Sequence, residues 1–315
     1  AAQCLVDQAW LMVVLRVALV VAVVRAVLCI VIWAAVIRTV PDETLFVTTH
    51  ADSLVWAVGL IAVFTMYLER HGRVAWWWAG LVAPVMAVAL VLNTRRLSFV
   101  VLVVGGGYVF LSSRWRARRR LARAMPVVVP ILGLYVALGL LTPASPFFAP
   151  VQSLHSVAAG EDSSSRTREV ENYNLVRSIQ DSGVLGSGFG VAYHEYEQGG
   201  DISQIFREYR FVPHNQVLGL LLFGGPVGFA AVMLPMSLAT RRAHRARRSA
   251  EGLEGTDIRV AGAVAVAAVL AWAVQGWGDL GFTDEHVLVL AAVLAGGAAA
   301  LVTDRAEHAA VGGVT

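Results

Sequence analysis

Residues 11–37 read LMVVLRVALVVAVVRAVLCIVIWAAVI, an apolar run interrupted only by the charges of Arg16 and Arg25. About 20 mostly apolar residues are enough for a helix to cross the hydrocarbon core of a bilayer. The whole chain of 315 residues has the same character, because 57% of it is hydrophobic, 15% is charged and the mean hydropathy is +0.65. A water-soluble domain needs a more polar surface than this composition allows. The sequence therefore predicts an integral membrane protein.

Eight such runs bounded by charge predict an all-α, polytopic bundle of transmembrane helices. They cover residues 11–37, 54–68, 75–92, 98–113, 125–142, 216–239, 260–275 and 286–302. The chain begins at Ala1 without a methionine, and its first run is too long for the core of a signal peptide. We therefore expect the sequence to be incomplete at its N-terminus.

Two arginine-rich loops set the expected orientation. Residues 114–123 carry six arginines and residues 241–248 carry five, and loops rich in arginine stay in the cytoplasm. The long hydrophilic segment 143–213 lies between them with one span on each side, so we expect it to be external. The predicted organisation is a region 1–142 with five spans, an external loop 143–215, and a region 216–315 with three spans and a cytoplasmic tail.

The turn Asn93-Thr94-Arg95-Arg96-Leu97 places two arginines on the external side, where arginine is uncommon. One interpretation is a pair of interfacial arginines whose long side chains reach the headgroups. The other is an anion-binding site at the outer face. Arg25 lies too deep for such a site, and we expect it to pair within the bundle.

A helix is predicted over residues 166–182 in the external segment. Its apolar residues recur at three- and four-residue spacing and predict one stripe that lies on the membrane or on the ends of the spans, with Glu169, Glu171 and Arg177 elsewhere on the surface. The stripe consists of Val170, Tyr173, Leu175, Val176 and Ile179.

The string Gly186-Ser187-Gly188-Phe189-Gly190 follows this helix. It departs from the dinucleotide-binding pattern G-x-G-x-x-G, because Val191 stands where the third glycine is required. No βαβ unit precedes the string either, so a nucleotide-binding fold is excluded. Two interpretations remain, a flexible turn or a nest of backbone N–H groups that approaches a phosphate closely. In the spans, Gly224-Gly225-Pro226 predicts a kink and Gly105-Gly106-Gly107 a close helix approach.

Pro213-His214-Asn215 stands directly before the sixth span. Pro213 suits the first turn of that helix, which would place His214 and Asn215 at its N-terminus in the outer interface. Histidine exchanges a proton near neutral pH and can serve as a general base, although an interfacial histidine can also be purely structural. A metal site is disfavoured, because His155 and His194 stand far from His214 in the sequence and no zinc-binding spacing occurs. The sequence also lacks a G-x-S-x-G nucleophile motif.

Taken in order, these motifs resemble the O-antigen ligase-like superfamily of multispanning bacterial envelope proteins, which includes O-antigen ligases and exopolysaccharide polymerases. The resemblance covers about residues 85–240. Its motifs are the turn Asn93–Leu97, Arg168 followed by Glu171–Leu175, the glycine string 186–190, and Pro213–Leu220 entering a span that carries Gly224–Phe229.

The resemblance implies transfer of a glycan from a polyprenyl-diphosphate carrier to an acceptor hydroxyl at the outer face of the bacterial inner membrane, without a metal, nucleotide or other cofactor. His214 would act as the base, and Asn215 would orient it or cap the helix. Arginine forks suit the growing charge of a diphosphate leaving group. The expected substrate-binding residues are Arg95, Arg96, Arg168, Arg177, Arg210, Gly186, Gly188 and Gly190. The ligases often carry Ser-Arg-Gly at the arginine turn, so the choice between Arg95 and Arg96 stays open.

Several functional alternatives remain at this point. A ligase would transfer to a lipid core or a protein, and a polymerase to another lipid-linked repeat. A transporter or flippase of lipid-linked glycans is a rival, but transporters show paired repeats and charges near the midplane, whereas the unusual charges here gather on one face. A noncatalytic envelope protein is the third option. The expected partners are a lipid-linked glycan donor, a glycan or lipid-linked acceptor and the bilayer, and no nucleic acid, since the arginine loops set topology.

Overall fold

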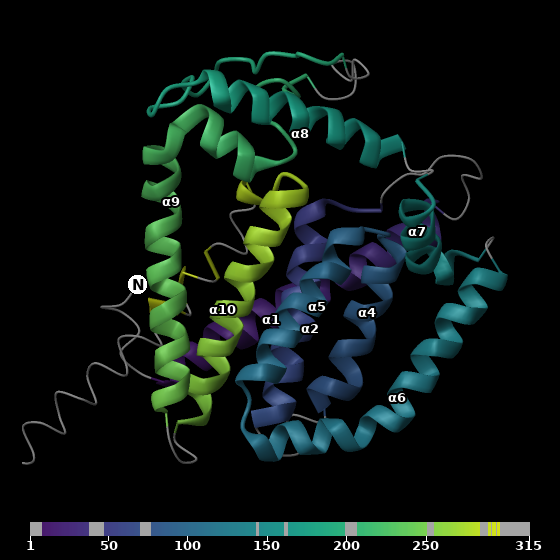
Figure 1. Ribbon diagram of the computed structural model, residues 1–315. Coiled ribbons are helices and arrows are strands. Elements are labelled where there is room, and N and C mark those ends of the chain that lie inside the picture. Colours follow the sequence, from purple (N-terminus) through teal and green to yellow (C-terminus); the bar gives the residue numbers. More distant parts are fainter. Residues whose placement is uncertain are drawn as a thin grey trace, which may run out of the picture. The chain divides into compact units, whose positions relative to one another are not determined.

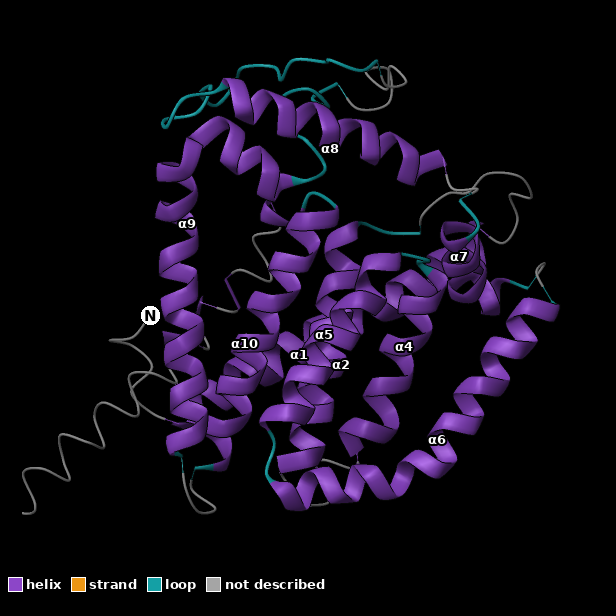
Figure 2. Ribbon diagram, in the orientation of Figure 1, coloured by secondary structure: helices purple, strands orange, loops and turns teal. Residues whose placement is uncertain are grey.

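The computed structural model describes residues 8–37, 47–69, 77–142, 145–160, 163–198, 207–250 and 255–283, with short pieces between 289 and 296. Over these residues the regular structure is helical and no strand occurs (Figure 2). The helices are α1 (Gln8–Ala35), α2 (His50–Glu69), η2 (Trp78–Val82), α4 (Ala83–Leu92), α5 (Arg96–Ser112), α6 (Trp115–Leu141), η3 (Pro146–Phe148), α7 (Ala149–Ala158), α8 (Ser163–Asp181), α9 (Gln216–Ser249), α10 (Thr256–Gly278) and η4 (Gly281–Thr283). The predicted all-α, polytopic class is confirmed.

The first seven predicted apolar runs coincide with helices over their described residues, and residues 75–76 of the third run lie outside the described part of the chain. Among the described residues, four helices, namely α1, α2, α9 and α10, are long and apolar enough to cross a membrane, and α6 becomes a fifth if its bent halves are counted as one span. The helical segments Trp78–Leu92 and Arg96–Ser112 are apolar but shorter. The eighth predicted run, 286–302, lies mostly outside the described residues.

The chain divides into two compact units. The first unit comprises Ala1–Ser153, Ala239–Ala271 and His286–Thr315, and the second comprises Leu154–Leu238 and Trp272–Glu285. Both α9 and α10 therefore run from one unit into the other. The predicted boundaries at 142 and 215 separate membrane-spanning regions from an external loop, whereas the two units are separated by how the chain packs. These boundaries stay a prediction.

In the first unit, α1, α2, α4 and α5 pack against one another (Figure 1). Gly105 of α5 lies so close to the Ile61 side chain that a Cβ would collide with it, which confirms the predicted close approach at this glycine, whereas Gly106 and Gly107 face open space. The predicted pairing of Arg25 within the bundle is also confirmed, because its guanidinium contacts the buried carboxylate of Asp52.

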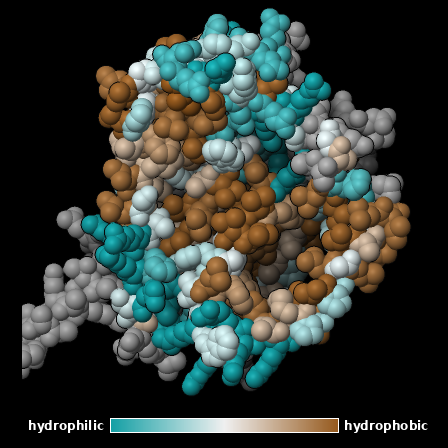
Figure 3. Space-filling model, viewed as in Figure 1, coloured by the Kyte–Doolittle hydropathy of each residue, from teal (hydrophilic) through white to brown (hydrophobic). Residues whose placement is uncertain are grey.

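Two helices expose long apolar faces. α6 exposes Val127, Ile131 and Leu134, each by about 60% of its surface, and α9 exposes Leu234 to the same extent. In Figure 3 the apolar stretch of α9 is brown, and its arginine-bearing end is teal. A soluble protein would bury such faces, whereas lipid tails solvate them.

The second unit is built around α8 and the first turns of α9. Its core consists of Leu175 from α8, Tyr193 from the following loop, and Leu222 and Phe223 from α9, with Ile179 and Leu218 packed against them. α9 is broken within this unit, because Gly225 adopts φ 61° and ψ −176° directly before Pro226. The kink predicted from Gly224-Gly225-Pro226 is thus confirmed. It orients the start of α9 along the α8 core.

Candidate functional site

The buried face of α8 is largely polar. Glu171, Asn174 and Ser178 are buried beside Leu175, and their three- and four-residue spacing places them on one side of the helix. Tyr173 and Val176, which the sequence predicted to lie in an apolar stripe, are both more than 40% exposed. The prediction that Glu171 lies on the surface was therefore wrong. Pairing with polar groups of the same unit offsets the cost of burying this carboxylate.

Glu171 holds His214 at two points. One carboxylate oxygen, Oε1, accepts the backbone N–H of His214 at 3.1 Å, and the other, Oε2, lies 3.2 Å from the ring nitrogen Nδ1. A carboxylate can only accept, so this contact places a proton on Nδ1. A neutral ring then carries its lone pair on Nε2. Because the His214 side chain is 23% exposed and that of Glu171 only 7%, the histidine faces outward from a buried carboxylate.

Asn215 caps α9. Its Oδ1 accepts the N–H of Leu218 at 3.2 Å, and its Nδ2 donates to Oδ1 of Asn172 at 3.0 Å. This is the expected geometry of an N-cap whose side chain reaches the third helical residue. α9 begins at Gln216, so Pro213 lies outside the first turn, contrary to the prediction. The ring of Pro213 instead packs against Gly219.

Arg168 lies one turn before Glu171 on α8. Its Nη2 is 3.8 Å from Oδ2 of Asp279, a buried carboxylate just after α10. This distance exceeds that of a hydrogen bond, so the contact is an ion pair that leaves the guanidinium fork accessible, with 36% of the Arg168 side chain exposed. Of the predicted arginines, Arg168 is the one that the structure places on the helix face that holds His214.

The loop after the glycine turn is clamped onto α8. The Asn174 side chain accepts the N–H groups of Tyr196 and Glu197 and donates to the Glu197 carbonyl. The Ser178 hydroxyl donates to the carbonyl of His194. These buried side chains keep a polar loop in one conformation, because each satisfies backbone groups that would otherwise lack partners.

Arg210 is engaged by that loop. Its Nη2 donates to the carbonyl of Tyr193 at 3.2 Å, and its Nε lies 3.8 Å from the Glu195 carboxylate. Burial raises the pKa of the Tyr193 hydroxyl above its ordinary value, and the nearby carboxylates of Glu171 and Glu195 raise it further. Arg210 therefore balances a locally acidic patch, and its predicted role in substrate binding stays a prediction.

The glycine turn packs against the break in α9. The N–H of Ser187 donates to the carbonyl of Leu222 at 2.8 Å, and that of Gly188 donates to Phe223 at 3.0 Å. The N–H of Gly186 donates within the turn to Gly183. In the nest interpretation, the N–H groups of Gly186 and Gly188 would donate to a phosphate. In the structure both donate to backbone carbonyls of the same chain. A Cβ on Gly186 would collide with the α9 backbone, so close packing against α9 requires a glycine at this position. The role of Gly190 as a phosphate contact stays a prediction.

Arg177 lies away from His214. It follows Glu171 by six residues, roughly 120° around the helix, and it is exposed beside Tyr173. Its Nε donates to the Tyr173 hydroxyl at 3.4 Å. The structure does not bring this arginine together with Glu171 and His214.

Arg95 and Arg96 belong to the first unit. Arg95 is the N-cap residue of α5 and Arg96 its first helical residue. The turn before them is fixed by the buried side chain of Asn93, which donates to Ser53 at 2.7 Å and accepts the N–H of Thr48 at 2.9 Å. A helix N-terminus carries partial positive charge, so two arginines there add to a local positive field. Their role in binding substrate stays a prediction.

Within the described ranges, no group of three or more His, Cys, Asp or Glu side chains is arranged to hold a metal ion.

Residues 81–233 match the family model for O-antigen ligase. Over this stretch, which is just under half of its length, the chain is similar to the O-antigen ligase-like superfamily. No curated protein matches it. The match contains the arginine turn, Glu171 and His214. This family comprises membrane glycosyltransferases of the O-antigen ligase and polymerase type, which act on lipid-linked glycans.

Two residues of the candidate site are not identified by the sequence, Glu171 as a buried residue and Asp279. The sequence predicts a surface position for Glu171 within its motif, and it contains no motif that singles out Asp279. The signal for Glu171 was present, because Glu171, Asn174 and Ser178 recur at helical spacing and mark a polar face. Asp279 had no such signal, since its relation to Arg168 depends on how the chain returns after α10.

Proposed function

We propose that this protein transfers a glycan from a polyprenyl-diphosphate carrier to an acceptor hydroxyl, with His214 as the general base. The observation that carries this proposal is the double contact from Glu171 to His214. It orients the ring and favours the tautomer whose Nε2 can take a proton.

In the proposed step, Nε2 of His214 accepts the proton of the acceptor hydroxyl. The acceptor oxygen forms a bond to the anomeric carbon of the donor sugar while the bond from that carbon to the diphosphate breaks. The bonding electrons leave with the polyprenyl diphosphate, and the proton on His214 then passes to solvent. This reaction needs no oxidant, and the diphosphate is already a good leaving group.

The diphosphate gains negative charge as it leaves, and arginine is the side chain best suited to bind it. Arg168 is supported by its place one turn from Glu171 and by its accessible fork. Arg95 and Arg96 are supported by their match to the family's arginine turn and by the N-terminus of α5. We infer that the site faces outward from the bacterial inner membrane, because the arginine-rich loops 114–123 and 241–248 favour the cytoplasm.

The test is complementation of a strain from which the gene has been deleted, with variants at matched membrane abundance. His214→Ala should abolish surface polymer and cause lipid-linked glycan to accumulate, because loss of a general base costs about 10²–10⁴-fold in rate. His155→Ala is the control, since His155 is an exposed histidine on α7. Normal polymer from the His214→Ala protein would contradict the proposed base.

The same experiment distinguishes a transporter from a transferase. If the protein moved lipid-linked glycans across the membrane, its failure would trap them on the cytoplasmic leaflet, out of reach of periplasmic glycosidases. Failure of a transferase traps them on the outer leaflet, where the same enzymes cleave them. The second pattern is the expected one.

A further inference from the structure

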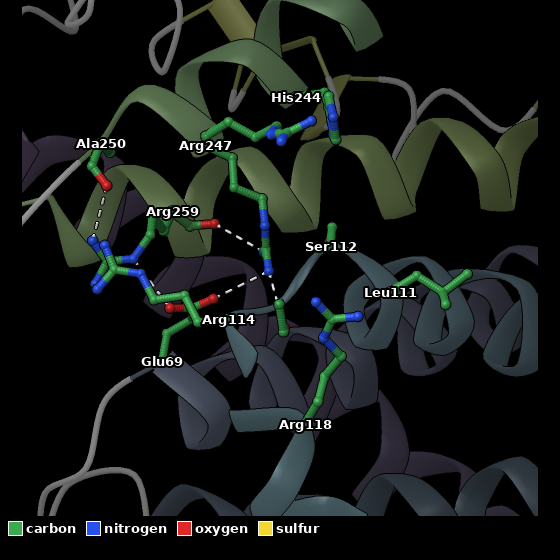
Figure 4. Close-up of a pocket in the computed structure, with 11 residues that line it drawn as sticks. Glu69, Leu111, Ser112, Arg114, Arg118, His244, Arg247, Ala250 and Arg259 are labelled. Carbon is green, nitrogen blue, oxygen red and sulfur yellow. Dashed lines mark hydrogen bonds and ion pairs between the residues drawn. The ribbon is translucent and has the colours of Figure 1, made fainter. Parts of the chain in front are cut away.

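A polar cavity of about 350 Å³ lies at one end of the first unit (Figure 4). The helices α2, α5 and α9 end there, and α6 and α10 begin there. Its charged lining consists of Glu69, Arg114, Arg118, Arg247, Arg248 and Arg259. The arginine content of its loops predicts that this end is cytoplasmic, and its lining residues all belong to the first unit, whereas His214 belongs to the second.

The floor of the cavity is a closed network around Glu69. Arg247 and Arg259 each donate to one oxygen of its carboxylate at 3.1 Å. Arg247 also donates to the hydroxyl of Ser113, and Arg259 to that of Thr256. All three charged side chains are less than 10% exposed. Two arginines share one carboxylate, so the floor carries one surplus positive charge in a buried place.

The rim adds three more arginines. Over the described residues, Arg114, Arg118 and Arg248 form no ion pair with a carboxylate, and the Nε of Arg118 is buried without a hydrogen-bond partner. In Figure 4, Arg118 extends from α6 toward the space in which Arg247 ends. The described lining therefore has a formal charge of +4 with His244 neutral. Such a concentration of like charge is costly without a counter-charge.

We propose that this cavity binds a phosphate group, carried either by an acidic phospholipid headgroup or by a small soluble phosphate. Arginine forks match phosphate oxygens in bidentate geometry, and the volume lies within the range of about 300–1,000 Å³ that is typical of ligand sites. Leu111 and Trp115 are both more than 60% exposed beside the arginines. Exposed tryptophan next to arginine is typical of the depth at which headgroups lie.

The test is a titration of the full chain in detergent micelles with phosphatidylglycerol, phosphatidylcholine or inorganic phosphate. Bound lipid is counted by native mass spectrometry, and phosphate binding is followed by the unfolding temperature. The test variant is Arg114→Ala/Arg118→Ala, which leaves the Glu69 network intact. The matched control is Arg116→Ala/Arg123→Ala, which removes two exposed arginines of the same segment that do not line the cavity.

We expect one saturable phosphate site per chain. Its affinity should fall by roughly a hundredfold in the test variant, about tenfold for each charged hydrogen bond lost, and by less than about threefold in the control. Binding of phosphatidylglycerol but not of inorganic phosphate identifies a lipid headgroup, and the reverse identifies a soluble phosphate. If the test variant does not fold, the single variant Arg118→Gln replaces it. Absence of saturable binding, or an equal loss in test and control variants, overturns the proposal.

Discussion

Replacing Glu171 by glutamine removes a buried charge while it preserves the size of the side chain. The glutamine oxygen can still accept the backbone N–H of His214, the bond that measures 3.1 Å to Glu171. The glutamine amide would then face Nδ1, which now lies 3.2 Å from a carboxylate oxygen. Because an amide NH₂ only donates, Nδ1 would have to accept and the proton would move to Nε2. His214 could then no longer take a proton at Nε2.

The expected loss follows from this change of tautomer. General-base catalysis contributes about 10²–10⁴-fold, and we expect kcat to fall by at least about 10²-fold in Glu171→Gln. The KM should change by less than about threefold, because the Glu171 side chain is only 7% exposed and has little access to substrate. The free energy of unfolding should fall by about 1.5–3 kcal/mol, the range for a hydrogen bond to a charged group.

The assay measures transfer from lipid-linked glycan, extracted from the deletion strain, to its acceptor by purified protein in nanodiscs. Glu169→Gln is the matched control, since it makes the same charge change at an exposed position of α8. The double variant Glu171→Gln/His214→Ala should be no slower than His214→Ala alone, because the two residues act as one unit. A Glu171→Gln protein with more than half of the wild-type kcat, or losses that multiply in the double variant, would refute the reasoning.

Three further predictions concern stability. Asn215→Ala should lower the free energy of unfolding by about 1 kcal/mol through loss of the α9 cap, while Asn215→Asp should retain it, as measured by chemical denaturation. Gly225→Ala should cost more than about 2 kcal/mol, because its positive φ is strained for alanine and the new Cβ would strike the carbonyl of Val184. Gly228→Ala, with open space around it, should be neutral or stabilising by up to about 1 kcal/mol in the same assay. The pKa of Tyr193 is raised in the folded state, so folding favours its neutral hydroxyl. The stabilisation of the folded state by Tyr193 is therefore complete below the ordinary tyrosine pKa of about 10 and is lost as pH rises above it. Tyr193→Phe should therefore reduce the drop in unfolding temperature between about pH 8 and pH 11, and an identical drop in both proteins would contradict this.

The helices could be predicted because a spanning helix is specified by local composition. Its length and apolar character follow from the bilayer rather than from distant parts of the chain. The break at Gly225 was predictable for the same reason, since a Gly-Gly-Pro sequence disrupts a helix wherever it stands. The cap at Asn215 needed only the boundary of one helix.

The site was only partly predictable because its key contacts join distant segments. Hydrophobic periodicity predicts burial only for apolar residues. It therefore placed Glu171 on the surface, whereas this carboxylate is buried and contacts His214. The role of Gly186 and Gly188 in binding phosphate stays a prediction, and in the structure their N–H groups donate to the carbonyls of Gly183 and Phe223. The glycines do permit a close backbone approach, but the partner is α9 of the same chain, and sequence spacing carries no information on which partner approaches.

Arg168 and Glu171 bring the two needs of the proposed transfer onto one helix. Residues three apart on a helix have Cβ atoms about 5–6 Å apart, so a cation for the leaving group and the carboxylate that orients the base are fixed by the same rigid element. Glu171 directs both oxygens to His214, while Asp279 approaches Arg168 only to 3.8 Å. A tighter bidentate pair would neutralise the arginine and occupy its fork. The looser contact restrains the guanidinium and leaves donors of its fork for the diphosphate that we propose it binds, so a buried acid beside Arg168 is compatible with the proposed anion site.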